Sequence, residues 1–267
     1  MSAAAAGATP REVVHRSPRL FGLERNRWRL ADLGRVGPWL RGRRPASVHR
    51  ILRRLDVRYK RGRAYSHSPD PAYDAKLAAV TAAQLLARAN PGAVVLLYQD
   101  EFTYHRRPMV SRGWAPRRVD APRAEQGLGT NKRRRVAACL DATTGRVVAW
   151  QRHRFDRKTL ARFYHAVAAA YPDAETIFLA QDNWPVHTHP ELLAALPPSI
   201  TLLALPTYAP WTNPVEDLWR ALLGDVLHHH GFGDDWAGLQ AAVEGWLAGW
   251  ADGSSDLLRR VGLCPDE

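Results

Sequence analysis

Three short, continuously apolar runs place the strongest constraint on how this chain folds. They cover residues 93–98, 176–180 and 200–205. Unbroken apolar runs of this length are typical of strands that are covered on both faces. Two further β-rich pieces, 134–140 and 146–151, flank the turn sequence Asp-Ala-Thr-Thr-Gly and indicate a hairpin. The pattern predicts a mixed α/β sheet with short antiparallel strands at one side.

Helical periodicity fills much of the chain between and after these strands. Apolar residues recur at helical spacing in 156–171, where Leu160, Phe163, Tyr164 and Val167 define one face. A helix of about twenty residues is also expected before the first strand, at 72–89. The other expected helices cover 190–196, 214–228, 236–250 and 255–261.

Positive charge is concentrated in the first quarter of the chain. The formal net charge is +12, and residues 1–67 contain 17 basic and 4 acidic side chains, against 21 and 22 in the remaining 200 residues. Such asymmetry indicates a polyanion-binding region joined to a balanced globular domain. A solvated basic tail is the alternative. We therefore divide the chain into a basic region (1–65), a linker and helix (66–91) and a sheet domain (92–267).

The basic region contains a helical pattern that a tail would lack. In residues 46–55 the apolar side chains Val48, Ile51, Leu52 and Leu55 fall on one face. This arrangement resembles a helix-turn-helix, with 46–55 as the helix that enters the major groove. A basic extension at 57–63 is expected to lie on phosphates. The basic side chains expected to contact DNA are Arg43, Arg44, His49, Arg50 and Arg53.

Two of the predicted strands run into the same polar sequence. The first continues into Gln99-Asp100 and the second into Gln181-Asp182. Ligands of open α/β sheets bind outside the carboxyl ends of the strands, so these two aspartates are expected to converge there. Capping of a helix or turn is the alternative role for each.

A third carboxylate follows the last apolar run. Glu216 opens a predicted helix after a Pro-rich loop, at the edge of the apolar face. Asn213 has the features of an N-cap and Glu216 those of the N3 position, so a capping box competes with a catalytic role for this residue.

Together these segments resemble the DDE transposases of the IS630 and Tc1/mariner group. The matching pieces are Gln99-Asp100-Glu101, Arg112-Gly113-Trp114-Ala115, Asp182-Asn183 with His187, and the run from Leu205-Pro206-Thr207-Tyr208 to Asn213-Pro214-Val215-Glu216. The resemblance covers about residues 20 to 230 and implies an RNase H-like catalytic domain, a mixed five-stranded sheet with flanking helices. It also implies DNA strand cleavage and strand transfer with Mg²⁺ or Mn²⁺. The implied catalytic and metal-binding residues are Asp100, Asp182 and Glu216.

The chemistry of phosphodiester attack agrees with that set. Two Mg²⁺ ions activate the attacking oxygen and neutralise charge on the phosphoryl and leaving oxygens, and hard carboxylate oxygens are their preferred ligands. Asp100 would bridge both ions, and the division of the ions between the other two carboxylates stays open. Asn183 and His187 would orient a metal-bound water or a phosphate, or simply hold a loop. Because clustered carboxylates repel one another, we expect the pKa of one of them to stay raised until metal binds.

The resemblance further implies double-stranded DNA as the partner, with transposon terminal inverted repeats, a TA target and a homodimer on DNA. The basic region is shorter than in relatives with two helix-turn-helix units, so we expect either a truncated element or a second reading frame. A non-catalytic DNA-binding protein or decayed transposase, and an RNase H-like nuclease without strand transfer, are the alternative functions.

Composition sets the remaining expectations. No apolar run is long enough to cross a bilayer, so we expect no membrane contact. Two cysteines cannot form a disulfide framework, which fits a bacterial cytoplasm and association with the nucleoid on DNA. Three side-chain environments are also predicted: Glu101 on the opposite strand face from Asp100, Trp114 in the core unless it stacks on DNA, and an exposed His228–His230 run.

Overall fold

The computed structural model describes residues 9–59, 68–116 and 121–264. By its contacts the chain divides into two compact units, Met1–Tyr65 and Ser66–Glu267, and each is treated by itself. The end of the predicted basic extension and the start of the predicted linker fall in residues 60–67, outside the described residues.

The first unit is a small helical domain. It contains α1 (Pro10–His15), η2 (Pro18–Phe21), α2 (Leu30–Val36), η3 (Pro38–Leu40) and α3 (Pro45–Arg54). Val48 and Leu52 of α3 pack with Leu33 and Leu40 in the core of this unit, as the periodicity predicts. Gly34 of α2 allows the close approach of the turn that follows, because a Cβ would lie only 3.0 Å from the carbonyl oxygen of Arg43.

The second unit is built on a five-stranded sheet in the order β3-β2-β1-β4-β5. Its strands are β1 (Val94–His105), β2 (Arg133–Asp141), β3 (Val147–Arg152), β4 (Thr176–Gln181) and β5 (Ile200–Ala204). Strands β1, β4 and β5 are parallel, and β2 and β3 join antiparallel beside β1. The predicted mixed sheet, with its antiparallel hairpin at one side, is confirmed.

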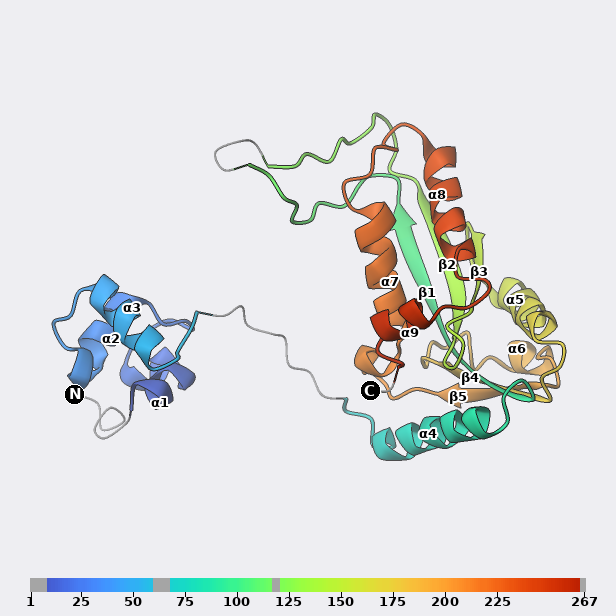
Figure 1. Cartoon of the computed structure of the whole chain (residues 1–267), viewed down its shortest axis with the longest axis horizontal. Helices are drawn as coiled ribbons and strands as arrows, with labels where there is room; N and C mark the ends of the chain where they lie inside the picture. Colours follow the sequence, from blue (N-terminus) through green and yellow to red (C-terminus); the bar gives the residue numbers. More distant parts are fainter. Residues whose placement is uncertain (1–8, 60–67, 117–120, 265–267) are drawn as a thin grey trace. The chain divides into compact units, whose positions relative to one another are not determined.

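Helices cover both faces of this sheet, as Figure 1 shows. Successive β1 residues alternate between two cores: Leu96 and Tyr98 face one, and Val95 and Leu97 face the other. The helices that contribute to the first core are α4 (Tyr73–Ala89), α7 (Val215–Leu222), α8 (Trp236–Ala248) and α9 (Ser255–Arg260). The second core contains α5 (Arg157–Ala170) and α6 (Pro190–Ala194). Both faces are therefore buried, which explains the unbroken apolar runs.

Strand β1 extends seven residues beyond its predicted end at Tyr98. Its parallel pairing with β4 stops at Tyr98, opposite Ala180, but its antiparallel pairing with β2 continues to His105. Asp100 therefore lies inside a strand, opposite Ala138, whereas Asp182 directly follows β4. Both aspartates still lie just past the end of the parallel pairing between β1 and β4. Beyond Tyr98, β1 pairs only with β2 among the described strands.

Two predicted environments are wrong. The Trp114 side chain is fully exposed instead of lying in the core, which leaves stacking on DNA as the alternative for this residue. The His228–His230 run is not an exposed helix end: His230 is buried, and His228 and His229 are half-buried. A single π-helical turn, η5 (Leu223–Leu227), follows α7 and turns these histidines inward, where His229 accepts a hydrogen bond from the backbone of Ser111. Helical periodicity cannot signal such a turn.

In the residues that the structure describes, no helix combines the length and apolarity needed to cross a membrane.

Candidate active site

The three acidic residues singled out by the sequence line one cavity. Asp100 of β1, Asp182 after β4 and Glu216 of α7 share a cavity of about 370 Å³ with the loop 205–210. Residues more than eighty positions apart in the sequence meet because β1 and β4 are neighbours and α7 packs across the first core. The sheet therefore brings together three carboxylates that the sequence only suggests.

Asp100 is held by hydrogen bonds on both carboxylate oxygens. Its Oδ1 accepts from the backbone N–H of Glu101 (2.8 Å), and its Oδ2 accepts from the indole N–H of Trp219 (2.9 Å). Burial is the largest influence that raises the pKa of Asp100 to about 7, and the charges of Glu101 and Glu216 add to it. The Trp219 hydrogen bond acts in the opposite direction. Near neutral pH this carboxyl is poised between its two protonation states.

Trp219 is a positioning residue that sequence reasoning did not identify. It is buried, stacks on Phe102 with ring centroids 5.3 Å apart, and lies three residues after Glu216 on the same helix. Residues at i and i+3 share a helix face, so the signal was present in the spacing. One face of α7 thus supplies the carboxylate of Glu216 and also the indole N–H of Trp219, which fixes the carboxylate of Asp100.

Asn213 anchors the start of α7 to β1. Its side-chain amide donates to the carbonyl oxygen of Gln99 (3.1 Å), and its oxygen accepts from the backbone N–H of Val215 (3.3 Å). The Asn213 side chain therefore caps the first turn, but its own backbone N–H donates to the carbonyl oxygen of Pro210, and no described hydrogen bond joins it to the Glu216 side chain, so the capping box considered for Glu216 does not form. Burial raises the pKa of Glu216, with the charges of Asp217 and Asp182 adding to the effect.

Asp182 is joined to β1 through a buried histidine. His187 has a side chain only 1% exposed, and its ring nitrogens lie 3.2 Å from Asp182 Oδ1 and 3.2 Å from Glu101 Oε1. Burial lowers the pKa of His187, but the hydrogen bonds to Asp182 and Glu101 outweigh it and raise the pKa to about 10. In turn, the His187 hydrogen bond lowers the pKa of Asp182. Glu101 faces away from Asp100 as predicted, yet it reaches Asp182 through this imidazolium.

Asn183 holds the loop that forms one wall of the cavity. Its amide donates to the carbonyl oxygen of Leu205 (2.6 Å) and to the hydroxyl of Thr207 (3.2 Å). This contact corresponds to the loop-holding alternative considered for Asn183.

The donor set suits a hard divalent cation. Carboxylate oxygens are the ligands that Mg²⁺ and Mn²⁺ prefer. Burial, with a smaller contribution from neighbouring carboxylates, raises the pKa values of Asp100 and Glu216. Among the described residues no group of three His, Cys, Asp or Glu side chains is close enough to form a finished metal site. The three carboxylates therefore line one cavity but do not lie close enough together to form a complete set of metal ligands.

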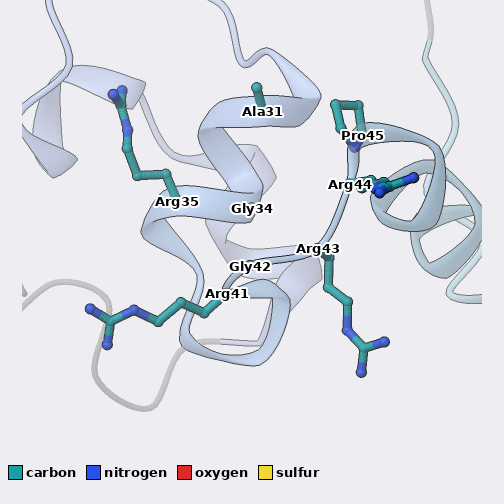
Figure 2. A pocket seen from close by; sticks show the side chains of 8 residues that line it. All are labelled: Ala31, Gly34, Arg35, Arg41, Gly42, Arg43, Arg44 and Pro45. Carbon is teal, nitrogen blue, oxygen red and sulfur yellow. The ribbon is translucent and has the colours of Figure 1, made fainter.

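The basic side chains of the first unit lie on its surface. Arg43, Arg44, His49, Arg50 and Arg53 are all exposed. His49, Arg50 and Arg53 lie on α3 away from its packed face, and Arg43 and Arg44 directly precede the helix. Figure 2 shows a depression beside the turn into α3, where the side chains of Arg35, Arg41 and Arg43 point in different directions. Arginines that do not converge are poorly arranged for one small anion and better suited to the spaced phosphates of a polymer.

The sheet order, the helices on both faces and the placement of the carboxylates define an RNase H-like fold. Solved structures share it: the mariner Mos1 paired end complex with Mg has a TM-score of 0.60 at 15% identity, over 91% of this chain and 79% of that one. The Mos1 transposase paired-end complex with left transposon end has a TM-score of 0.57 at 15% identity, over 82% of this chain and 66% of that one.

The chain belongs to the DDE superfamily endonuclease family, which it matches over residues 95–236. It is 28% identical over 235 residues to the insertion element IS630 uncharacterized 39 kDa protein of Shigella sonnei. That alignment covers 85% of this chain and 66% of the relative, so the chain spans about two thirds of the length of that protein. The predicted resemblance to the IS630 and Tc1/mariner group is confirmed.

Proposed function

We propose that this protein is a transposase that cleaves DNA at transposon ends and joins the freed strand to target DNA with Mg²⁺ or Mn²⁺. The observation that carries the proposal is the convergence of Asp100, Asp182 and Glu216 on one cavity of an RNase H-like fold. Family membership, and solved relatives that were crystallised with transposon ends or with Mg, support it.

Asp100, Asp182 and Glu216 would hold the cations. When bound, the ions activate the attacking oxygen and offset the charge that develops on the phosphoryl group. The protein's own part is to fix the carboxylates: Trp219 and the Glu101 backbone orient Asp100, and His187 orients Asp182. Asn213 ties the helix of Glu216 to the strand of Asp100, which fixes the position of Glu216 relative to Asp100.

The proposed substrate is double-stranded DNA with terminal inverted repeats, a TA dinucleotide is the proposed target, and a homodimer on DNA is the proposed assembly. The first unit would bind the repeats through α3. The proposed place of action is the cytoplasm, on nucleoid DNA, which agrees with the free thiols of Cys139 and Cys264.

A cleavage and integration assay tests the proposal. The full chain, incubated with DNA carrying the ends of its element, should cut in Mg²⁺ or Mn²⁺, stop in EDTA, and insert the cut ends into a target plasmid. Cleavage without insertion would indicate a nuclease that does not join strands. Specific binding without cleavage in either metal would contradict an enzymatic function and leave a DNA-binding protein.

Removing one arginine from α3 should weaken DNA binding and reduce its dependence on salt. Arg50→Ala and Arg53→Ala each remove an exposed charge, and each lost phosphate contact lowers the slope of log K against log salt by about 0.9. Titrations at several salt concentrations measure the slope, with Arg88→Ala on α4 as a control that keeps it. An unchanged slope together with relaxed preference at one base pair would instead indicate base contacts.

A further inference from the structure

Strand β3 leaves one edge of the sheet open. In the described sheet it is the last strand, with β2 on one side and no strand on the other (Figure 1). The backbone N–H of Val147 points outward, because it donates to the carbonyl oxygen of Trp250 (3.0 Å). Every second residue of an antiparallel strand points its N–H and C=O to the same side, so those of Ala149 and Gln151 also point outward. In the described part of the chain, these two N–H groups have no partner on that side.

This edge forms the floor of a groove between two helices. The groove has a volume of about 590 Å³ and is lined by the whole of β3, by Ala170 at the end of α5, and by Leu247 and Ala248 of α8. Natural sheets usually protect such an edge with proline, a bulge or a covering segment. Residues 147–152 contain no proline, and no bulge interrupts their register with β2. The edge therefore has both the room and the free backbone groups to accept one more strand.

Arginines without carboxylate partners line this groove. Arg146 is held at the carboxyl end of α5, where it donates to a backbone carbonyl oxygen (2.6 Å), and the guanidinium of Arg152 lies 4.5 Å from the ring centroid of Trp150. Arg134 reaches the groove from β2. Within the described ranges, no ion pair engages any of these three arginines. Glu244 is the only acidic side chain among the described lining residues, so the groove carries an excess of positive charge.

The two walls of the groove differ in chemistry. Trp150 faces the second core beside α5, and Ala149 faces the first core beside α8. An added strand alternates in the same way, so one set of its side chains lies between Arg146 and Arg152 and the other set lies against α8. Carboxylates six positions apart match the first set, because that is the spacing of the two arginines. Small apolar side chains match the second set.

We infer that the edge of β3 binds an extended acidic segment of a partner protein, which adds to the sheet as a further strand. Backbone hydrogen bonds to Ala149 and Gln151 provide affinity, and alternate side chains provide specificity. DNA fits this groove poorly, because Glu244 and the apolar lining would meet its phosphates. A second copy of the chain also fits poorly. Two β3 strands paired about Ala149 would place Arg146 of one copy opposite Arg152 of the other, and like charges in opposite positions destabilise a sheet.

The groove is separate from the cavity that the three carboxylates line. In the described part of the chain the two have no lining residue in common, and β2 lies between β3 and the strand of Asp100. A segment bound at the β3 edge therefore leaves the carboxylate cavity open. The inference goes beyond the proposed function and does not depend on it.

Fluorescence anisotropy with the full chain tests the inference. The probe is the labelled, capped peptide Glu-Ala-Val-Ala-Val-Ala-Glu, whose carboxylates have the spacing of Arg146 and Arg152 and whose sequence is the same in both directions. It should bind, and hydrogen exchange of the β3 amides should slow. The same peptide with an N-methyl group on its central alanine lacks an N–H for the edge and should bind about tenfold more weakly.

A charge exchange tests the position of the bound strand. Arg152→Glu should weaken binding of the acidic peptide about tenfold, because like charges then face each other. Of the two peptides that carry lysine in place of one glutamate, one should bind Arg152→Glu more tightly than the wild type. Arg154→Glu, at an exposed arginine outside the groove, is the matched control and should leave the affinity for the acidic peptide unchanged.

The inference is overturned if the acidic peptide does not bind, or if N-methylation and Arg152→Glu leave its affinity unchanged. Displacement of the peptide by a short DNA duplex would assign the groove to nucleic acid instead. A dimer in sedimentation that the peptide dissociates would assign it to a second copy of the chain. A protein that cleaves and joins DNA ends but does not bind the peptide retains the proposed function and loses only this inference.

Discussion

Replacing Asp100 with asparagine is expected to abolish metal-dependent cleavage. The side chain lies in the shared cavity and would be a ligand of the cations, whose charge stabilisation is worth several kcal/mol in the transition state, or about a thousandfold or more in rate. Asp182→Ala should cause a loss of the same order. Cleavage of end-bearing DNA measures both, and Asp173→Asn, which changes an exposed turn aspartate, is the control. Unchanged cleavage in either carboxylate variant would contradict the proposed mechanism.

The same Asp100→Asn substitution should make the metal-free protein relatively more stable as pH rises. The pKa of Asp100 is raised from its ordinary value of 3.8 to about 7 in the folded state, so its contribution to folding is fully present below pH 3.8 and is lost as pH rises through 7. Asparagine does not ionise and avoids that loss. The amide has one oxygen for two donors, Glu101 N–H and Trp219 N–H, so the gain is smaller than the pKa shift implies, about 1 kcal/mol at pH 8.

Melting in EDTA at pH 5 and pH 8 checks this prediction. The melting temperature of Asp100→Asn, relative to that of the wild type, should be higher at pH 8 than at pH 5. Addition of Mn²⁺ should stabilise the wild type, because a ligand that binds only the folded state adds to its stability, and should have little effect on Asp100→Asn. Equal stabilisation of both proteins by Mn²⁺ would place the ion elsewhere.

The local pattern of the sequence predicts the layers of this fold well. Leu96 to Tyr98 alternate between two cores, and covering both faces of a strand requires apolar side chains throughout. What the pattern cannot predict is where a strand stops when only one neighbour continues. β1 runs on to His105 because β2 pairs with it there, and residues 99–105 combine polar and aromatic side chains that carry no signal of burial.

The sequence predicts which acidic residues form the candidate site, but it does not predict the hydrogen bonds and ion pairs that hold them. Asp100, Asp182 and Glu216 follow from strand ends, a helix start and a family resemblance. The links among them depend on distant pairs, such as Asn213 with Gln99 or His187 with Glu101. Such contacts exist only once β1, β4 and α7 are packed together. No spacing rule joins residues that are 86 positions apart.

Replacing His187 with glutamine should destabilise the metal-free protein by about 3 kcal/mol at pH 7. The buried imidazolium bridges the carboxylates of Glu101 and Asp182. Solvent screens the Asp182 carboxylate, which is 58% exposed, so most of the cost comes from Glu101, which is 15% exposed and loses its charged partner. Glutamine retains one hydrogen bond at most and carries no charge. Urea denaturation in EDTA measures the difference, and His165→Gln, at an exposed histidine, should change stability by less than about 0.5 kcal/mol.

The effect of His187→Gln should also depend on pH in a defined direction. The folded pKa of His187 is about 10, above its ordinary value of 6.5, so the stabilisation that it provides is complete below pH 6.5 and is lost as pH rises through 10. The gap in unfolding free energy between wild type and variant should therefore be widest at pH 6 and narrow steadily toward pH 10. A gap that stays constant over this range would mean that His187 acts through packing and neutral hydrogen bonds. The charged bridge between β1 and Asp182 would then be absent, and another group would have to hold Asp182 in place.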